Sequence, residues 1–264
     1  KPVIKILNKA DLADPELTKA WMEYLEQQDG VKAIACDDNK ADDVKRIIAL
    51  CKKMVPNKVG TGRQIKAMIM GIPNVGKSTL INTLAGRAVA RTGDEPAVTK
   101  SQQLIKLDDD IMLYDTPGML WPKVENENSG YRLAATGGIR DTAFDFADVA
   151  SYTAEYLMQA YPELLKTRYK IDELPKTDWE FFEIAGRNRG CVRAGNKVDT
   201  YRMSEILVNE LRSAKIGRIT LETPAMTEAE ELVVAEQRIA AEEKRIAKEE
   251  EKRLRRLKTR KNRK

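Results

Sequence analysis

Apolar residues along the first 70 positions alternate between the pattern of a buried strand and that of a helix with one apolar face. Short apolar runs predict strands at Val3–Leu7, Val31–Cys36 and Ile65–Met70. Apolar residues three and four positions apart predict helices at Pro15–Gln28 and Ala41–Met54. Alternation of this kind is typical of a doubly wound α/β fold with a mainly parallel sheet, and both sides of the Pro56–Gly62 linker are expected to contribute to one sheet.

The next part of the chain predicts a helix and then a hairpin. A helix is expected to begin at Lys77, after a glycine-rich loop. The apolar runs Leu104–Leu107 and Ile111–Tyr114 flank three aspartates, Asp108–Asp110, which is typical of two strands joined by a tight turn.

From about residue 144 onward, few apolar runs predict strands. Helices are predicted at Phe144–Tyr161, Asp178–Ala185 and Met203–Ser213, joined by loops that contain proline and glycine. From Thr227 onward the chain is rich in Ala, Glu, Lys and Arg without Gly or Pro, which predicts an exposed helix that frays into a tail. We therefore expect an α/β domain at 1–143, a small mainly helical domain at 144–224, and a charged helix with a basic tail at 225–264.

The net charge of +5 conceals an uneven distribution. Residues 252–264 carry nine Lys or Arg and no acid, so the other residues together carry a net charge of −4. A basic tail of this kind suits phosphate groups such as those of RNA, although it is also compatible with a disordered, solubilising tail.

Composition excludes several classes of protein. There are three cysteines without a CxxC pair and no histidine, so a Cys/His zinc site and a histidine base are not expected. No apolar run approaches the length of a membrane span and no signal peptide opens the chain, so we expect a cytoplasmic protein that binds no membrane.

The strongest chemical signal is the complete GxxxxGK[ST] motif Gly71–Ser78, which lies between a predicted strand and a predicted helix. Backbone amides of such a loop cradle the phosphates of a nucleotide. Lys77 is expected to reach the β- and γ-phosphates, and the Ser78 hydroxyl is expected to ligate Mg²⁺. The predicted nucleotide-binding residues of this loop are Asn74, Val75, Gly76, Lys77, Ser78 and Thr79.

A second phosphate-side motif is Asp115-Thr-Pro-Gly118, directly after the predicted strand Ile111–Tyr114. Asp115 is expected to hold Mg²⁺ through water, and the Gly118 amide to sense the γ-phosphate. Between the two motifs, Thr99 is the predicted switch threonine for Mg²⁺ and the γ-phosphate, with Thr92 as its competitor. Lys77, Thr99 and Gly118 are the predicted catalytic groups.

The choice of base rests on Asn8-Lys9-Ala-Asp11, which follows the strand Val3–Leu7. The Asp11 carboxylate can accept from N1–H and the exocyclic amine of guanine, donors that adenine does not present in that pattern. Asn8 would brace the loop and the Lys9 stem would lie over the base. This favours GTP over ATP as the nucleotide.

The Asn8–Asp11 sequence has the pattern Asn-Lys-x-Asp (NKxD), and a second NKxD sequence, Asn196–Asp199, lies after the phosphate motifs. The preceding residues, Arg189–Gly195, include two arginines and two glycines and do not predict a buried strand. We therefore interpret Asn196–Asp199 as coincidental. With Asn8–Asp11 first, the motifs run in circularly permuted order, and Ala35-Cys36-Asp37 would occupy the position of the remaining base loop.

These residues resemble the circularly permuted GTPases of the YlqF, or ribosome biogenesis GTPase A, family. The similar stretches are LNKADLAD (7–14), GIPNVGKSTLIN (71–82), PAVTKSQQ (96–103), DTPGMLWPK (115–123) and GRITLETP (217–224). The resemblance implies a monomeric GTPase acting late in large-subunit ribosome assembly, with the helical domain on rRNA rather than DNA. It also implies stimulation by K⁺, with Asn74 as the position tied to that ion, and an upstream stretch before Lys1.

The residue after Gly118 is Met119, where many GTPases have a glutamine that orients the attacking water. Methionine cannot do this, so slow intrinsic hydrolysis is expected, with the assembling particle as activator. Two other functions stay open on the sequence: a nucleotide-gated RNA-binding scaffold with little hydrolysis, and a P-loop ATPase.

Overall fold

The computed structural model describes residues 1–264 except 38–39, 91–102, 121–123 and 262–264, and it leaves the side chains of residue 251 and of 253–261 undescribed. The chain divides into two compact units, Lys1–Leu221 and Glu222–Lys264. None of the helices in the described ranges is both long and apolar enough to cross a membrane.

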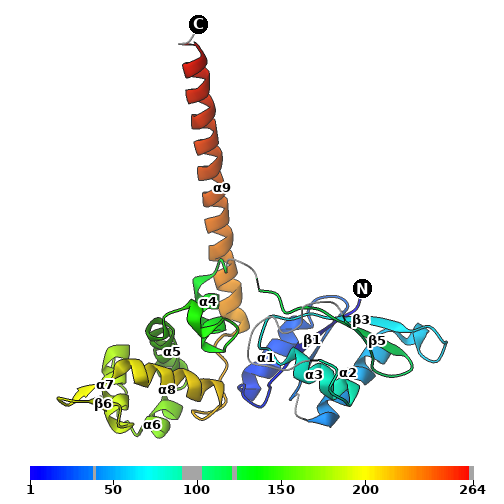
Figure 1. The fold of residues 1–264 in the computed structure, drawn as a ribbon, viewed down its shortest axis with the longest axis horizontal. Helices are drawn as coiled ribbons and strands as arrows, with labels where there is room; N and C mark the ends of the chain where they lie inside the picture. Colours follow the sequence, from blue (N-terminus) through cyan, green and yellow to red (C-terminus); the bar gives the residue numbers. More distant parts are fainter. Residues whose placement is uncertain (38–39, 91–102, 121–123, 262–264) are drawn as a thin grey trace. The chain divides into compact units, whose positions relative to one another are not determined.

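The α/β part of the first unit contains two separately hydrogen-bonded sheets (Figure 1). The strands are β1 Val3–Leu7, β2 Val31–Ala35, β3 Ile65–Ile69, β4 Gln103–Lys106 and β5 Ile111–Asp115. The first sheet pairs β1 and β2 in parallel, in the register Val3↔Val31; the second has the order β3-β5-β4, with β3 parallel and β4 antiparallel to β5. The hairpin prediction is confirmed, whereas the prediction of one continuous sheet is wrong for the described residues.

One hydrophobic core nevertheless joins the two sheets. It contains Ile34 of β2, Ile105 of β4 and Leu113 of β5, together with apolar side chains of the helices α2 and α3. The helices of this part are α1 Pro15–Leu25, α2 Ala41–Met54, the 3₁₀ turn η1 Pro56–Lys58 and α3 Lys77–Ala85. Burial of apolar area, rather than a shared ladder, therefore holds the two sheets together.

The helices after β5 are α4 Glu127–Ala135, the 3₁₀ turn η2 Asp141–Ala143, α5 Phe146–Ala160, α6 Pro162–Tyr169, α7 Asp178–Asn188 and α8 Thr200–Arg212. Capping side chains explain where α1, α4, α5, α7 and α8 begin. The side chains of Asp14, Asn126, Asp145, Thr177 and Asp199 each accept from backbone amides of the first turn.

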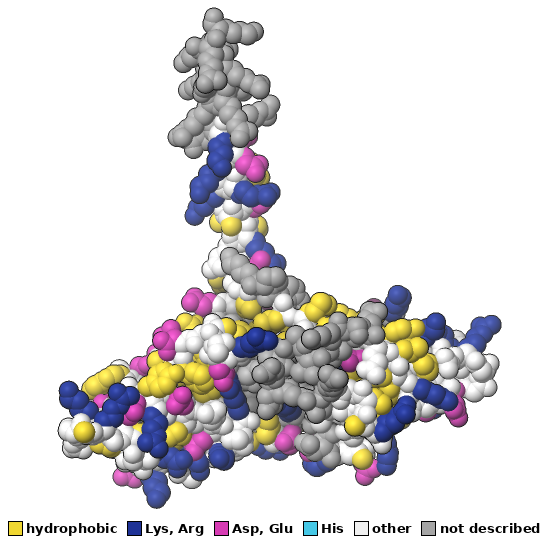
Figure 2. All heavy atoms as spheres, in the orientation of Figure 1, with side chains coloured by type: hydrophobic (Ala, Val, Ile, Leu, Met, Phe, Trp, Pro, Cys, Tyr) yellow, Lys and Arg dark blue, Asp and Glu magenta, His cyan; other side chains and the backbone are white. Residues whose placement is uncertain are grey.

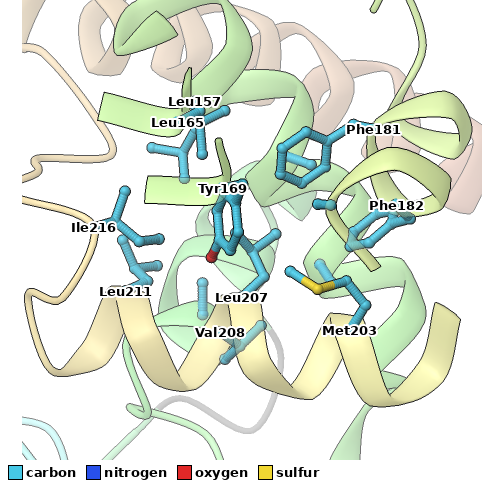
Figure 3. Close-up of a cluster of buried hydrophobic side chains, with 14 of the residues drawn as sticks. Leu157, Leu165, Tyr169, Phe181, Phe182, Met203, Leu207, Val208, Leu211 and Ile216 are labelled. Atoms are coloured by element: carbon cyan, nitrogen blue, oxygen red, sulfur yellow. The ribbon is translucent and has the colours of Figure 1, made fainter. Parts of the chain in front are cut away.

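The helices after β5 share a second hydrophobic core (Figure 3). Tyr169, Phe181 and Leu207 are fully buried in it, and Ala134 and Ala135 at the end of α4 belong to it. Between α7 and α8 lies a hairpin of two-residue strands, β6 Val192–Arg193 and β7 Lys197–Val198. The predicted boundary at residue 143 stays a prediction.

The second unit is dominated by one helix, α9 Pro224–Lys261. In its described part, the helix carries both Lys or Arg and Glu side chains (Figure 2). Arg245 and Glu242 pair at 2.7 Å, and Leu232, Ile239 and Ile246 are exposed. Its helical pattern agrees with the expectation for the residues beyond Thr227.

Candidate nucleotide site

The loop after β3 has the backbone of a phosphate-binding turn. Asn74 and Gly76 adopt positive φ angles of 61° and 86°, and α3 begins at the next residue, Lys77. The motif therefore turns sharply into a helix N-terminus, where free amides and the helix dipole favour an anion. Ser78 and Thr79 lie in the first turn of α3, as expected for groups that face a nucleotide.

The second phosphate-side motif, Asp115–Gly118 (the DxxG loop), lies directly against this turn because β3 and β5 are adjacent parallel strands. Thr116 Oγ1 donates to the carbonyl of Ile69 at 2.7 Å, and the Met119 amide donates to the Gly71 carbonyl at 3.3 Å. A Cβ on Gly118 would lie 3.4 Å from the Pro73 nitrogen, in van der Waals contact with the phosphate-binding turn. The two phosphate-side motifs thus form one surface.

The Lys77 ammonium contacts the Asp115 carboxylate and the Thr116 carbonyl. The Lys77 side chain is 8% exposed and that of Asp115 is fully buried. The lysine predicted to hold phosphates and the carboxylate predicted to hold Mg²⁺ therefore meet at one point.

The donor set fits GTP with Mg²⁺. Within the described ranges no three His, Cys, Asp or Glu side chains gather into a metal site. Mg²⁺ is commonly held by one or two protein oxygens, with water and substrate phosphates completing its shell, so the predicted Ser78 and Asp115 would be sufficient protein groups to hold it. Thr99, the third predicted ligand, and its competitor Thr92 lie outside the described residues.

The structure also places the Asn8–Asp11 loop beside the Gly71–Ser78 phosphate-binding loop (the P-loop). Asn8 Nδ2 donates to the Val75 carbonyl at 2.9 Å, and Lys9 Nζ donates to the Asn74 carbonyl at 3.2 Å. Lys9 has a φ of 55° and Asp11 is exposed. The predicted base-reading loop thus borders the predicted phosphate loop, as a bound nucleotide requires.

The predicted second base loop, Ala35–Asp37, is adjacent. The amide of Ala10 donates to the Cys36 carbonyl at 3.1 Å, and the amide of Cys36 donates to the Leu7 carbonyl at 2.9 Å. The two loops that follow β1 and β2 therefore lie side by side at the carboxyl end of their parallel pair.

The other NKxD sequence has a different setting. Asp199 accepts from the amide of Arg202 at the start of α8 and pairs with Arg193 Nε at 2.7 Å. The Arg193 hydrogen bond is the main cause of the lowered pKa of Asp199. Its carboxylate is thus occupied in capping a helix and closing a hairpin.

Two sets of contacts to the site were missed from the sequence. Asn74 Nδ2 donates to the Gly137 carbonyl at 2.9 Å, just after α4. Arg218 donates to the Ala10 and Ala13 carbonyls on either side of Asp11. The only signal for the second set was the GRITLETP stretch, which the family resemblance had singled out without a structural role.

Comparison with known proteins matches this chain to GTPases. The family described as 50S ribosome-binding GTPase matches residues 66–172. The ribosome biogenesis GTPase A of Priestia megaterium is 44% identical over 236 residues, which cover 86% of this chain and 82% of that protein. The protein of the same name from Bacillus cereus is 46% identical over 231 residues, covering 85% of this chain and 78% of that protein. This chain belongs to the ribosome biogenesis GTPase A family.

Solved structures agree with that membership. A GDP-bound structure of YlqF superposes with a TM-score of 0.59 at 26% identity, covering 84% of this chain and 83% of that one. GNP-bound YlqF from T. maritima gives a TM-score of 0.58 at the same identity, covering 84% and 81%. The permuted motif order is consistent with this match. As a member of this GTPase family, the chain hydrolyses GTP, which removes the P-loop ATPase alternative.

Proposed function

We propose that this GTPase is an assembly factor that acts late on the large (50S) ribosomal subunit, binds rRNA, and is released when it hydrolyses GTP. Residues 1–143 would form the nucleotide-binding domain, 144–224 the helical RNA-binding domain and 225–264 a charged helix with a basic tail. The protein would work as a monomer in the cytoplasm. The names of the relatives, ribosome biogenesis GTPase A, support a role in ribosome assembly.

The observation that carries the proposal is the side chain that follows the DxxG glycine. Met119 is 66% exposed beside the phosphate motifs, and a thioether cannot orient the attacking water. The intrinsic rate should therefore be low, and a partner should complete the site. A ribosomal particle that supplies the missing group would couple its own maturation to hydrolysis and release.

In this mechanism the chain contributes mainly positioning and charge. Amides of Gly76 to Thr79 and the Lys77 ammonium would bind the phosphates, while Ser78, Asp115 and Thr99 would hold Mg²⁺. The Gly118 amide would respond to the γ-phosphate. The Asn74 side-chain oxygen is the proposed protein ligand of a K⁺ ion that adds positive charge near the transferring phosphoryl group.

The test is GTP turnover with and without purified large-subunit precursor at saturating concentration. We expect turnover to rise at least tenfold with the precursor and to stay near the basal rate with mature small subunits. Unchanged turnover with the precursor would refute activation by the particle.

The basic tail supports rRNA as the partner. Each phosphate neutralised by Lys or Arg releases counterions, so binding should fall steeply with salt. Removing residues 252–264 should weaken binding to the precursor at physiological salt and flatten the salt dependence. If affinity and salt dependence are unchanged, the tail is a solubilising segment only.

A nucleotide-gated scaffold is the second candidate, and Met119 is also the observation that favours it. Single-turnover hydrolysis in the presence of the precursor separates the two functions. Release without cleavage of GTP would support the scaffold, and release that follows the cleavage rate would support the GTPase cycle.

A further inference from the structure

The segment between α8 and α9 lies along the base-reading loop. Arg218 Nη2 donates to the Ala10 carbonyl at 2.7 Å, and its Nε donates to the Ala13 carbonyl at 2.8 Å. These two carbonyls lie on either side of Asp11, more than 200 residues earlier in the sequence. One guanidinium therefore spans the loop that carries the guanine-reading carboxylate.

Neighbouring residues reinforce this contact. The Ile219 amide donates to the Leu12 carbonyl at 3.0 Å, and the Asp14 amide donates to Thr220 Oγ1 at 3.2 Å. The hydroxyl of Tyr161 donates to Asp14 Oδ2 at 3.0 Å. Hydrogen bonds with Arg218, Ile219, Thr220 and Tyr161 thus hold the base-reading loop along its length, from Ala10 to Asp14.

Two features keep this arrangement in place. Burial is the main reason that the pKa of Tyr161 rises to about 12, so its hydroxyl remains a hydrogen-bond donor even well above neutral pH. Gly217 has a φ of 152°, and a Cβ there would lie 2.7 Å from Leu164 Cδ1. The backbone before Arg218 therefore requires glycine.

Guanine recognition depends on where the Asp11 carboxylate lies. Two charge-assisted hydrogen bonds to one base edge require a well-fixed acceptor, because a displacement of a fraction of an ångström weakens both. Asp11 itself is exposed, so its position depends on the backbone of its own loop. In the described residues that backbone is hydrogen-bonded by Arg218 at both ends.

We propose that Arg218 is a positioning residue for guanine recognition, so that the segment after α8 contributes to the affinity and base selectivity of the nucleotide site. This inference does not rest on the proposed ribosomal role. It implies that a ligand that displaces the 216–221 segment weakens GDP and GTP binding, and that bound guanine nucleotide in turn stabilises this segment.

The test measures binding of fluorescent GDP and IDP with Mg²⁺ to the full chain, without any ribosomal particle. Hypoxanthine lacks the exocyclic amine of guanine, so the ratio of the two affinities reports how well Asp11 is placed. Arg218→Ala should weaken GDP binding about tenfold and reduce the GDP/IDP ratio, because charged hydrogen bonds to the loop are lost. Arg218→Lys should give an intermediate loss, since one ammonium replaces a two-pronged guanidinium.

Two controls separate positioning from general stability. Arg193→Ala removes an exposed arginine that pairs with Asp199, and should leave both affinities within twofold of wild type. In an Asp11→Asn background, Arg218→Ala should add less than a twofold further loss, because both changes act through one carboxylate. If Arg218→Ala keeps the wild-type GDP/IDP ratio, whether or not both affinities fall, the proposal is overturned. If Arg218→Ala does not fold, Arg218→Lys decides by the same ratio.

Discussion

The side-chain amide of Asn74 donates to the main-chain carbonyl of Gly137 at 2.9 Å, across 63 residues of sequence. A carbonyl only accepts, so the NH₂ group must face Gly137 and the amide oxygen must face elsewhere. The carbonyls before Gly137 are held in turn, because Arg212 donates to Ala134 and Ala135 and pairs with Asp141. The orientation of the P-loop asparagine is therefore linked to α8.

This orientation leads to a prediction about monovalent ions. GTP turnover should be several-fold faster in K⁺ than in Na⁺ for the wild type, and Asn74→Ala should be equally slow in both, because the proposed oxygen ligand is gone. Steady-state phosphate release at constant ionic strength is the measurement. Asn188→Ala is the matched control, since Asn188 donates to the Tyr169 and Lys170 carbonyls far along the chain, and it should keep the K⁺ response.

The two NKxD sequences allow a paired test of base recognition. Asp11→Asn should weaken GDP binding at least a hundredfold, because an amide cannot accept both guanine donors, whereas the same change should improve binding of xanthine nucleotides. Asp199→Asn should leave GDP affinity unchanged and lower stability slightly, because asparagine also caps helices but loses the ion pair with Arg193. Fluorescent-nucleotide titration checks both; GDP binding damaged only by Asp199→Asn would contradict the permuted assignment.

Gly118 should tolerate no side chain without loss of hydrolysis. Gly118→Ala brings a Cβ to 3.4 Å from the Pro73 nitrogen and 3.5 Å from its Cα, so the methyl group fits in van der Waals contact but prevents any closer approach of the DxxG loop to the P-loop. We expect single-turnover GTP cleavage to fall about ten- to a hundredfold, as for loss of an aligned transition-state donor, with GDP affinity changed less than fivefold. Gly130→Ala, on α4 with no atom within 4 Å of the new Cβ, is the control and should cleave GTP normally. Equal rates for the two variants would contradict this prediction and show that a methyl group at position 118 does not disturb the site.

The sequence predicted those features whose cause is local. The strand–loop–helix around Gly71–Ser78 and the helix starting at Ala41 follow from apolar spacing and turn chemistry within a dozen residues. The grouping of the α/β strands into two separate sheets was not predictable, because apolar runs indicate burial but not which neighbour completes the hydrogen bonds. Arg218 was not recognisable either, since an exposed arginine in a loop gives no sign of carbonyl partners 200 residues away.

A buried ion cluster in the helical part gives a prediction about stability. Glu210 is 5% exposed and accepts from Arg168 Nε at 2.8 Å, Arg189 Nη2 at 2.6 Å and the Tyr169 hydroxyl at 3.1 Å. Burial alone would raise its pKa, but the hydrogen bonds from Arg168 and Tyr169 and the Arg189 charge outweigh it, so the pKa lies below 4.5. Glu210→Gln should cost about 2 kcal/mol at pH 7, less than a fully buried pair because both arginines are partly exposed.

The pH dependence of that loss has a definite sign. The folded-state pKa of Glu210 is lowered, so its contribution is fully present above the unfolded value near 4.5 and disappears as pH falls through the folded value. Denaturant unfolding of wild type and Glu210→Gln should therefore differ most at neutral pH, and the difference should shrink as the pH falls below 4.5 and through the lowered folded-state pKa. The exposed Glu173 provides the control, and Glu173→Gln should unfold like the wild type at every pH. A difference between wild type and Glu210→Gln that is constant from pH 7 to pH 3 would mean that the lost volume and shape, rather than the ionised carboxylate, account for the effect.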